Sequence, residues 1–207
     1  MCGRKVGRRL LTPSFLPTGA FTEVEVPFFE GADWRHTARR TMPEFRQQRH
    51  KPPAELLRPR ELIVACPPMR SNVNLSRIVR AAGCCGVRRV VCCGNAKVIG
   101  KIARDAEANV EIEVHRTLPP VLRKLREDGY LLVGLEQTSD SESLFDFHFG
   151  RKTVLVVGNE RLGVADKVLQ LLDHTVEIPV YGHPLSHNAA TAAAMALYEY
   201  CRQFPEG

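Results

Sequence analysis

Hydrophobic and polar residues follow a strand-like or helix-like period from residue 61 onward, whereas no sustained apolar period precedes it. Short apolar runs predict strands at 62–66, 88–94, 110–116, 130–137, 153–160 and 175–180. Helices are expected at about 74–84, 119–127, 165–172 and 188–203. Because strands alternate with helices and several strands are apolar throughout, the pattern predicts an α/β fold with a mostly parallel sheet and helices on both faces.

The break in pattern predicts two parts, an extension at 1–60 and a domain at 61–207. Scattered prolines and arginines make the extension largely irregular, with a short helix at Glu55–Arg58. It holds 12 Lys or Arg against 6 Asp or Glu, which accounts for the whole formal net charge of +6. Such a basic segment favours a polyanionic partner such as nucleic acid, or is a solvated leader. A mitochondrial transit peptide and a true start at Met42 are the alternatives for this segment.

Composition and cysteine usage narrow the class of protein. Hydrophobic residues at 44% and charged residues at 25% over 207 residues are typical of a globular chain. No run approaches 18 apolar residues, so no membrane span is expected. Seven cysteines, an odd number, without a recognisable signal peptide favour a reducing compartment, and we expect a cytoplasmic protein. The Cys84-Cys85 and Cys92-Cys93 pairs are spaced too closely for a zinc site, and no metal is expected.

The sequence lacks the motifs of several common enzyme classes. The glycine patterns of dinucleotide-binding and P-loop proteins are absent, as are the serine elbow of hydrolases and the paired-histidine helix of metalloproteases. Ligands of open α/β sheets bind beyond the carboxyl ends of the strands. The segments that follow the predicted strands therefore carry the candidate chemistry.

Three of these segments contain polar residues in a recurrent arrangement. The first, NLSRIVRAA, has Asn74 six residues before Arg80. The second, VLVVGNERLG, contains Gly158, Asn159, Glu160 and Gly163. The third runs from Ile178-Pro179 through Gly182 to Ser186 and Asn188, which opens an alanine-rich helix.

Together the three segments resemble the SPOUT class of methyltransferases, in its TrmH/SpoU branch of RNA ribose 2′-O-methyltransferases. The resemblance covers about residues 61–203. It implies a SPOUT fold with a C-terminal trefoil knot, S-adenosyl-L-methionine as methyl donor, and a homodimer with its site near the subunit interface. The implied substrate is the ribose 2′-hydroxyl of a structured RNA, a tRNA or an rRNA.

The resemblance also implies roles for particular residues. The expected catalytic and RNA-contacting set is Asn74, Arg80, Glu160, Ser186 and Asn188. The expected cofactor-binding set is Val156, Gly158, Ile178, Gly182 and His187. Arg80 is assigned as the base in this family, but a guanidinium stays protonated in proteins, so gripping a phosphate and orienting the hydroxyl is an equal alternative.

Two departures from the family pattern leave other interpretations open. Ser76 stands where the family has glycine, and His187 stands where it has leucine. These changes support one alternative, a catalytically silent SPOUT dimer that only binds RNA, whereas the retained Asn74, Arg80, Glu160 and Asn188 argue against it. An unrelated α/β nucleotide-binding module is a third possibility. Taken singly, Asn74 and Ser186 could be helix N-caps, Arg80 a solvated helix residue and Glu160 a first-turn acid.

Overall fold

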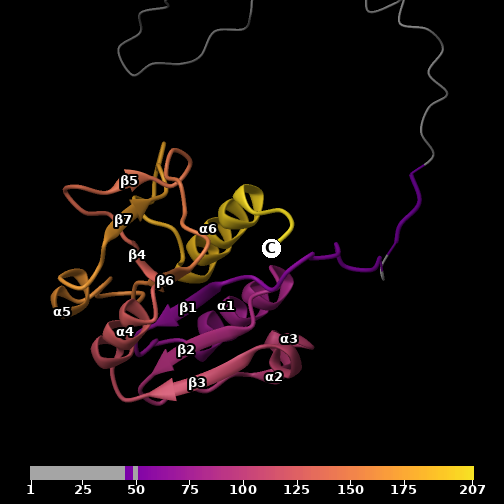
Figure 1. Cartoon of the computed structure of the whole chain (residues 1–207), viewed down its shortest axis with the longest axis horizontal. Coiled ribbons are helices and arrows are strands. Elements are labelled where there is room, and N and C mark those ends of the chain that lie inside the picture. Colours follow the sequence, from indigo (N-terminus) through magenta and orange to yellow (C-terminus); the bar gives the residue numbers. More distant parts are fainter. Residues whose placement is uncertain (1–44, 49–50) are drawn as a thin grey trace, which may run out of the picture. The chain divides into compact units, whose positions relative to one another are not determined.

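The computed structural model describes residues 45–48 and 51–207 (Figure 1). Packing divides the chain into two units, Met1–Pro52 and Pro53–Gly207. Most of the predicted extension, including Met42 and the segment considered as a transit peptide, lies outside the described residues. Every helix and strand of the described residues belongs to the second unit.

The unit Pro53–Gly207 contains seven strands and six helices. The strands are β1 (Leu62–Cys66), β2 (Arg89–Cys93), β3 (Glu111–His115), β4 (Leu131–Leu135), β5 (Glu142–Ser143), β6 (Thr153–Val157) and β7 (His174–Glu177). The helices are α1 (Asn72–Cys84), α2 (Gly100–Ala103), α3 (Ala106–Asn109), α4 (Leu118–Glu127), α5 (Asp166–Leu169) and α6 (Ala189–Gln203). All six predicted strands and all four predicted domain helices are present; β1 has the predicted bounds, and the others differ at one or both ends.

The strands form one parallel sheet in the order β3-β2-β1-β6-β4-β7-β5 (Figure 1). The two central strands, β1 and β6, are buried along their whole length. This burial explains their continuous apolar sequences, since a parallel sheet covered on both faces leaves no polar side. The predicted α/β fold with a parallel sheet is confirmed, and the trefoil knot stays a prediction.

Helices cover both faces of this sheet. Alternate residues of β1 divide between two apolar clusters, with Leu62 and Val64 in one and Ile63 and Ala65 in the other. The first cluster contains the buried faces of α1 and α6, which pack directly on each other. The second contains those of α4 and α5. The α1–α6 layer matters most for function, because the first turns of both helices border a pocket at the carboxyl edge of the sheet.

The predicted helix at Glu55–Arg58 is wrong, since the chain bends there instead. Pro59 disfavours helical dihedrals at the residue before it. The amides of Leu57 and Arg58 donate to the carbonyl of Glu206 at 3.0 and 3.3 Å, and Arg60 donates to the carbonyls of Cys85 and Phe204 at 2.7 and 2.5 Å. Residues just before β1 are therefore tied to the end of the chain.

Other boundaries differ for local reasons. Helix α1 begins at Asn72, two residues earlier than predicted, because Ser71 caps it. Strand β7 stops at Glu177, before Pro179, which has no amide hydrogen for a ladder. The short elements α2, α3 and β5 were not predicted, because four or fewer residues give too little periodicity to detect.

The end of α1 fixes the path into β2. Gly86 has a φ of +70°, its amide donates to Gly83, and the amide of Val87 donates to Ala82, both at 3.0 Å. This is the paired hydrogen-bond pattern of a Schellman cap, in which glycine is favoured because it adopts left-handed dihedrals without strain.

The cysteine pairs do not converge. Cys92 lies in the cluster under α1 and α6, whereas Cys93 lies in the cluster under α4 and α5. Within residues 45–48 and 51–207, no group of three or more His, Cys, Asp or Glu side chains is arranged to hold a metal ion. In the same residues, no helix is long and apolar enough to cross a membrane.

Candidate functional site

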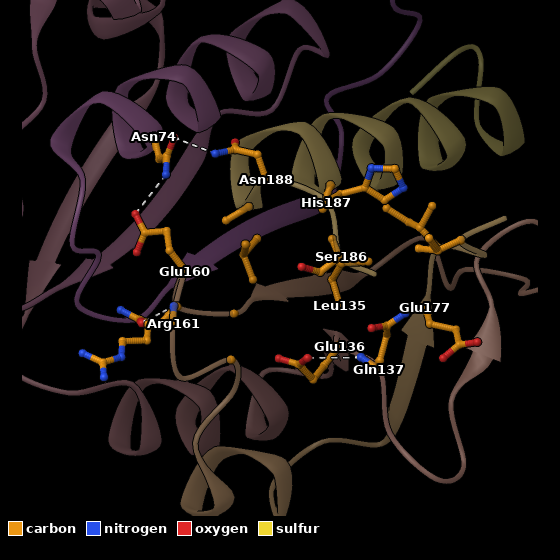
Figure 2. Close-up of a pocket in the computed structure, with 18 residues that line it drawn as sticks. Asn74, Leu135, Glu136, Gln137, Glu160, Arg161, Glu177, Ser186, His187 and Asn188 are labelled. Atoms are coloured by element: carbon orange, nitrogen blue, oxygen red, sulfur yellow. Dashed lines mark hydrogen bonds between the residues drawn. The ribbon is translucent and has the colours of Figure 1, made fainter. Parts of the chain in front are cut away.

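A pocket of about 360 Å³ lies beyond the carboxyl ends of β4, β6 and β7, bordered by the first turns of α1 and α6 (Figure 2). Seven predicted site residues line it, namely Asn74, Gly158, Glu160, Ile178, Ser186, His187 and Asn188. They come from three segments that are far apart in sequence. The structure therefore brings most of the three motifs together at one place.

A chain of side-chain hydrogen bonds joins the motifs on one side of this pocket. The Asn74 amide nitrogen donates to Glu160 Oε1 at 3.1 Å, and Asn74 Oδ1 accepts from Asn188 Nδ2 at 3.2 Å (Figure 2). Asn188 Oδ1 in turn accepts from the amides of Ala190 and Thr191, and so caps α6. Because Asn74 both donates and accepts, its orientation is fixed from both sides.

Glu160 is held by the start of α1. Besides Asn74, its carboxylate accepts from the amides of Arg70 at 2.9 Å and Ser71 at 3.0 Å. Burial by itself would raise the pKa of Glu160, but the hydrogen bonds from the Arg70 amide, its own amide, Asn74 and the Ser71 amide lower it below its usual value. Glu160 is thus an ionised, fully engaged group near the positive end of α1.

The loop Gly158–Gly163 gives a physical reason for the glycine-flanked second motif. The backbones of Asn159 and Gly163 exchange two hydrogen bonds of 2.9 Å, and Gly163 has a φ of +64°. The Asn159 side chain accepts from the amides of Arg161 and Leu162 and donates to the carbonyl of Pro68. This closed loop points Glu160 toward α1.

Glu136 lies on the opposite side of the pocket and was missed by the sequence analysis. Its Oε2 accepts from the Val164 amide at 2.8 Å, and Oε1 accepts from the Gln137 amide at 3.2 Å. A Cβ on Gly158 would stand 2.9 Å from Glu136 Oε2, and one on Gly163 closer still. The two glycines therefore make room for this carboxylate.

Glu136, Gln137 and Glu177 could have been found from the sequence. Glu136 and Gln137 end the predicted strand at 130–137, and Glu177 lies within the predicted strand at 175–180, so all three lie near the carboxyl edge where ligands bind. Figure 2 shows Glu136 and Gln137 across the pocket from Asn74 and Asn188. The other lining residues, which were not among the predicted catalytic and cofactor-binding residues, are Leu135, Val157, Asn159, Arg161, Gly163, Val180, Ala189 and Ala192.

The third motif forms the outer rim. Residues 181–188 are all exposed, and the side chain of Tyr181 is 94% exposed. Ser186 and His187 line the pocket from this rim, whereas Ile178 is buried at its base. The side-chain contacts of the rim are few, so its residues are available to a ligand or a second chain.

Three predicted site residues do not line the pocket. Arg80 is exposed on α1, where no side-chain partner is found for it among the described residues. Val156 is fully buried in the cluster under α4 and α5, so its side chain faces away. Gly182 lies in the exposed rim, where a Cβ would meet nothing within 4 Å.

The interpretation of Asn74 and Ser186 as helix caps is wrong. Ser71 caps α1, with its hydroxyl accepting from the Asn74 amide at 3.3 Å, and Asn188 caps α6. Glu160 is not in the first turn of its own helix, because α5 starts only at Asp166. Its carboxylate instead accepts a hydrogen bond from the amide of Ser71 at the amino-terminal end of α1. Ser71 and Glu160 are 89 positions apart in the chain.

Comparison with known proteins adds independent information. The sequence profile of the SpoU rRNA Methylase family matches residues 61–198. The chain is 26% identical over 146 residues to the tRNA (guanosine(18)-2'-O)-methyltransferase of Escherichia coli K12, which is 69% of this chain and 64% of that protein. It is 39% identical over 82 residues to mouse tRNA (guanosine(18)-2'-O)-methyltransferase TARBP1, which is 40% of this chain and 5% of that protein.

A solved structure supports the same relationship. The SpoU methyltransferase AviRb of Streptomyces viridochromogenes, in complex with the cofactor AdoMet, is 28% identical with a TM-score of 0.63. The match covers 73% of this chain and 63% of AviRb. The chain thus spans less than two thirds of the length of each of these relatives. Its motifs, its parallel sheet and the profile match over most of its length together show that this chain belongs to the SpoU rRNA methylase family.

Proposed function

We propose that this protein transfers a methyl group from S-adenosyl-L-methionine to the ribose 2′-hydroxyl of a structured RNA, a tRNA or an rRNA. Relatives named for 2′-O-methylation of tRNA and 23S rRNA support this function. The observation that carries it is the hydrogen-bonded series Glu160–Asn74–Asn188, which joins all three motifs at one pocket.

The pocket fits the cofactor in size and chemistry. Its volume of about 360 Å³ lies within the range of small-molecule sites. Leu135, Val157 and Ile178 supply an apolar lining for an adenine ring, and Gly158 leaves its backbone groups open to hydrogen bonding. The carboxylates of Glu136 and Glu177 complement ribose hydroxyls and a positive charge.

The chain's own groups account for binding and alignment. S-adenosyl-L-methionine supplies an electrophilic methyl group on a sulfonium, whose sulfur keeps the bonding electron pair when the methyl leaves. The 2′-hydroxyl must be aligned with that carbon and lose its proton. Glu160 is a poor proton acceptor, since three donors from Arg70, Ser71 and Asn74 already engage its oxygens. We assign it to positioning Asn74, which leaves Ser186 and Asn188 to contact the RNA.

Arg80 requires a different arrangement, because it does not line the pocket of its own chain. We propose a homodimer in which Arg80 of one copy reaches the pocket of the other, where it grips a phosphate beside the target ribose. The exposed rim at 181–188, with Tyr181 and Leu185 largely open, is the surface that a second copy would cover. The basic segment before Pro53 adds to RNA binding in this proposal.

The first experiment measures cofactor binding and methyl transfer. Calorimetry with S-adenosyl-L-methionine, followed by transfer of labelled methyl to unmodified tRNA and rRNA, should give binding and incorporation. Methylated positions should resist alkaline cleavage, because the 2′-oxygen is blocked. RNA binding without cofactor binding would instead support the silent dimer. His187→Leu further distinguishes the active methyltransferase from the silent dimer. An active enzyme should keep or improve its cofactor affinity when leucine, the family's residue, is restored at this position.

A second experiment tests whether two chains build one site. Arg80→Ala should lower methyl transfer roughly 100-fold, as loss of a positioned group does, while cofactor binding persists. When Arg80→Ala and Gly158→Trp chains are co-expressed with different tags, the mixed dimer should regain activity, because one of its two sites carries neither change. A mixed dimer as inactive as its parents would contradict the composite site. The extension is tested by deleting residues 1–52, which spares the contacts of Arg60.

A further inference from the structure

Charge is unevenly distributed within the domain. Residues 62–104 contain eight Lys or Arg and no Asp or Glu. The remainder of 61–207 contains nine Lys or Arg against 17 Asp or Glu. A domain that is neutral as a whole is therefore strongly basic over β1, α1, β2 and α2. This segregation is unrelated to the basic extension that precedes it.

Most of these cations face solvent without a partner. Arg89 pairs with Glu113 at 2.5 Å. The other seven side chains are exposed, and the structure has no hydrogen bond or ion pair for any of them within residues 51–207: Arg70, Arg77, Arg80, Arg88, Lys97, Lys101 and Arg104. Unpaired, exposed cations that repel one another favour a polyanion that neutralises them.

Two hydrogen bonds place a second basic segment along α1. The Lys97 amide donates to Asn72 Oδ1 at 3.4 Å, and the Ile99 amide donates to Ser76 Oγ at 2.8 Å. Asn72 and Ser76 are four helical residues apart, a rise of about 6 Å, and Lys97 and Ile99 are two extended residues apart, about 6.6 Å. The segment 97–99 therefore runs alongside α1 in the same direction. Helix α2 begins at Gly100, directly after Ile99, and packs against α1, so that Lys101 of α2 and Arg77 of α1 are both exposed cations on these two packed helices.

Ser76 is the residue that fixes this arrangement. It is fully buried, and its hydroxyl donates to the Asn72 carbonyl at 2.5 Å while accepting from Ile99. Glycine, which the family resemblance implies at this position, has no hydroxyl to offer. The departure that the sequence analysis marked as a sign of lost activity has a structural purpose in this chain.

We propose that Arg77, Lys97 and Lys101 form a phosphate-binding strip, the α1 strip, that holds the RNA backbone next to the pocket residue Asn74. Ser76 acts as its positioning residue. This inference rests on the proposed RNA methyltransferase function and assigns the surface by which its substrate docks. A second copy of the chain is a poorer occupant, because a two-fold axis through the strip would bring like charges together.

The test uses the full chain and an unmodified tRNA transcript as the probe. The variant Arg77→Gln/Lys97→Gln/Lys101→Gln is compared with Arg123→Gln/Lys124→Gln/Lys167→Gln, which removes the same charge from the exposed surfaces of α4 and α5 on the other face. Three lost phosphate contacts should reduce the slope of log K against log salt concentration by about 2 to 3. The affinity at moderate salt should fall roughly tenfold or more, and the control should keep the wild-type slope.

Equal slopes for the α1 variant and the wild type, or equal losses in the two triple variants, would overturn the strip. So would a monomeric α1 variant where the wild type is dimeric, since the strip would then be an interface between copies. Failure of the proposed function would give a different result. The wild-type protein would bind tRNA but would neither bind S-adenosyl-L-methionine nor methylate the RNA. Both triple variants should retain wild-type cofactor affinity.

Ser76→Ala tests the positioning role. The Ile99 amide should exchange its hydrogen faster, and the salt slope should become shallower although all three cations of the α1 strip remain. Cofactor affinity should not change. Because Ser76 is buried, Asn72→Ala provides a second variant at an exposed site that frees Lys97 alone. Unaltered exchange at Ile99 together with an unaltered salt slope in Ser76→Ala would overturn the role of Ser76.

Discussion

The side-chain amide of Asn188 donates to Oδ1 of Asn74 at 3.2 Å, which ties the cap of α6 to the first turn of α1. The two residues are 114 positions apart in the chain. Since Asn74 also donates to Glu160, one amide side chain orients residues from the other two motifs. This bridge therefore joins all three motifs at the pocket.

Replacing Asn74 should therefore damage the site at both ends. Asn74→Ala removes one side-chain hydrogen bond from Glu160 and one from Asn188, and we expect the free energy of unfolding to fall by about 1–3 kcal/mol. Methyl transfer should fall by roughly 100-fold or more, because the aligned groups lose their support. Chemical denaturation and single-turnover kinetics measure the two effects. Asn109→Ala is the control, since this exposed asparagine bonds only to a carbonyl of its own turn.

The difference in stability between the wild type and Glu160→Gln should depend on pH. The pKa of Glu160 is lowered in the folded protein, so its contribution is complete above the unfolded value near 4.5 and is lost as the pH falls through the lower folded value. The wild type should exceed the variant by about 1–2 kcal/mol at neutral pH. This difference should shrink in denaturation experiments below about pH 4. A difference that grew at low pH would contradict the assigned hydrogen bonds.

Gly158 and Gly182 form a matched pair of alanine substitutions. A Cβ at Gly158 would lie 2.9 Å from Glu136 Oε2 and 3.2 Å from the Gly163 backbone, so the loop must shift. We expect Gly158→Ala to weaken S-adenosyl-L-methionine binding roughly tenfold or more while the domain stays folded. Gly182→Ala should change nothing, since its Cβ meets no atom within 4 Å. Calorimetry measures the cofactor affinity of both variants. A larger loss of affinity in Gly182→Ala than in Gly158→Ala would contradict the prediction and place Gly182 at the cofactor.

Cys201 should be partly ionised, and so reactive, at neutral pH. A hydrogen bond from the Cys85 thiol, helped by the charge of Arg60 and opposed by burial, lowers the pKa of Cys201 to about 7. The same pairing raises the pKa of Cys85. Iodoacetamide labelling followed by peptide mass spectrometry should give a midpoint near pH 7 for Cys201.

The matching variant for this thiol is Cys85→Ala, which removes the donor. It should move the labelling midpoint of Cys201 upward, toward the ordinary value of 9.0. Because the thiolate is favoured in the folded state, its stabilising contribution is present above pH 9.0 and fades as the pH falls through 7. An unchanged midpoint in the variant would show that Cys85 does not set the reactivity.

The parallel sheet and the family could be predicted from the pattern of residues alone. Runs such as Leu62–Cys66 and Thr153–Val157 are apolar at nearly every position, which only a strand buried on both faces requires, so the parallel α/β fold followed directly. The motif glycines and polar residues stand at strand ends, and seven of the ten named site residues meet at one pocket.

Which side chains share that pocket could not be predicted in this way, because it depends on how the elements pack. Strand alternation turned Val156 toward α4 and α5, and the phase of α1 turned Arg80 to solvent, because a motif fixes sequence distance but not direction. Glu136 lines the pocket because the strand order places β4 beside β6. These two strands are separated by 17 residues, 136–152, in the chain. The role of Ser76 likewise depends on Ile99, a contact between segments whose meeting no local pattern encodes.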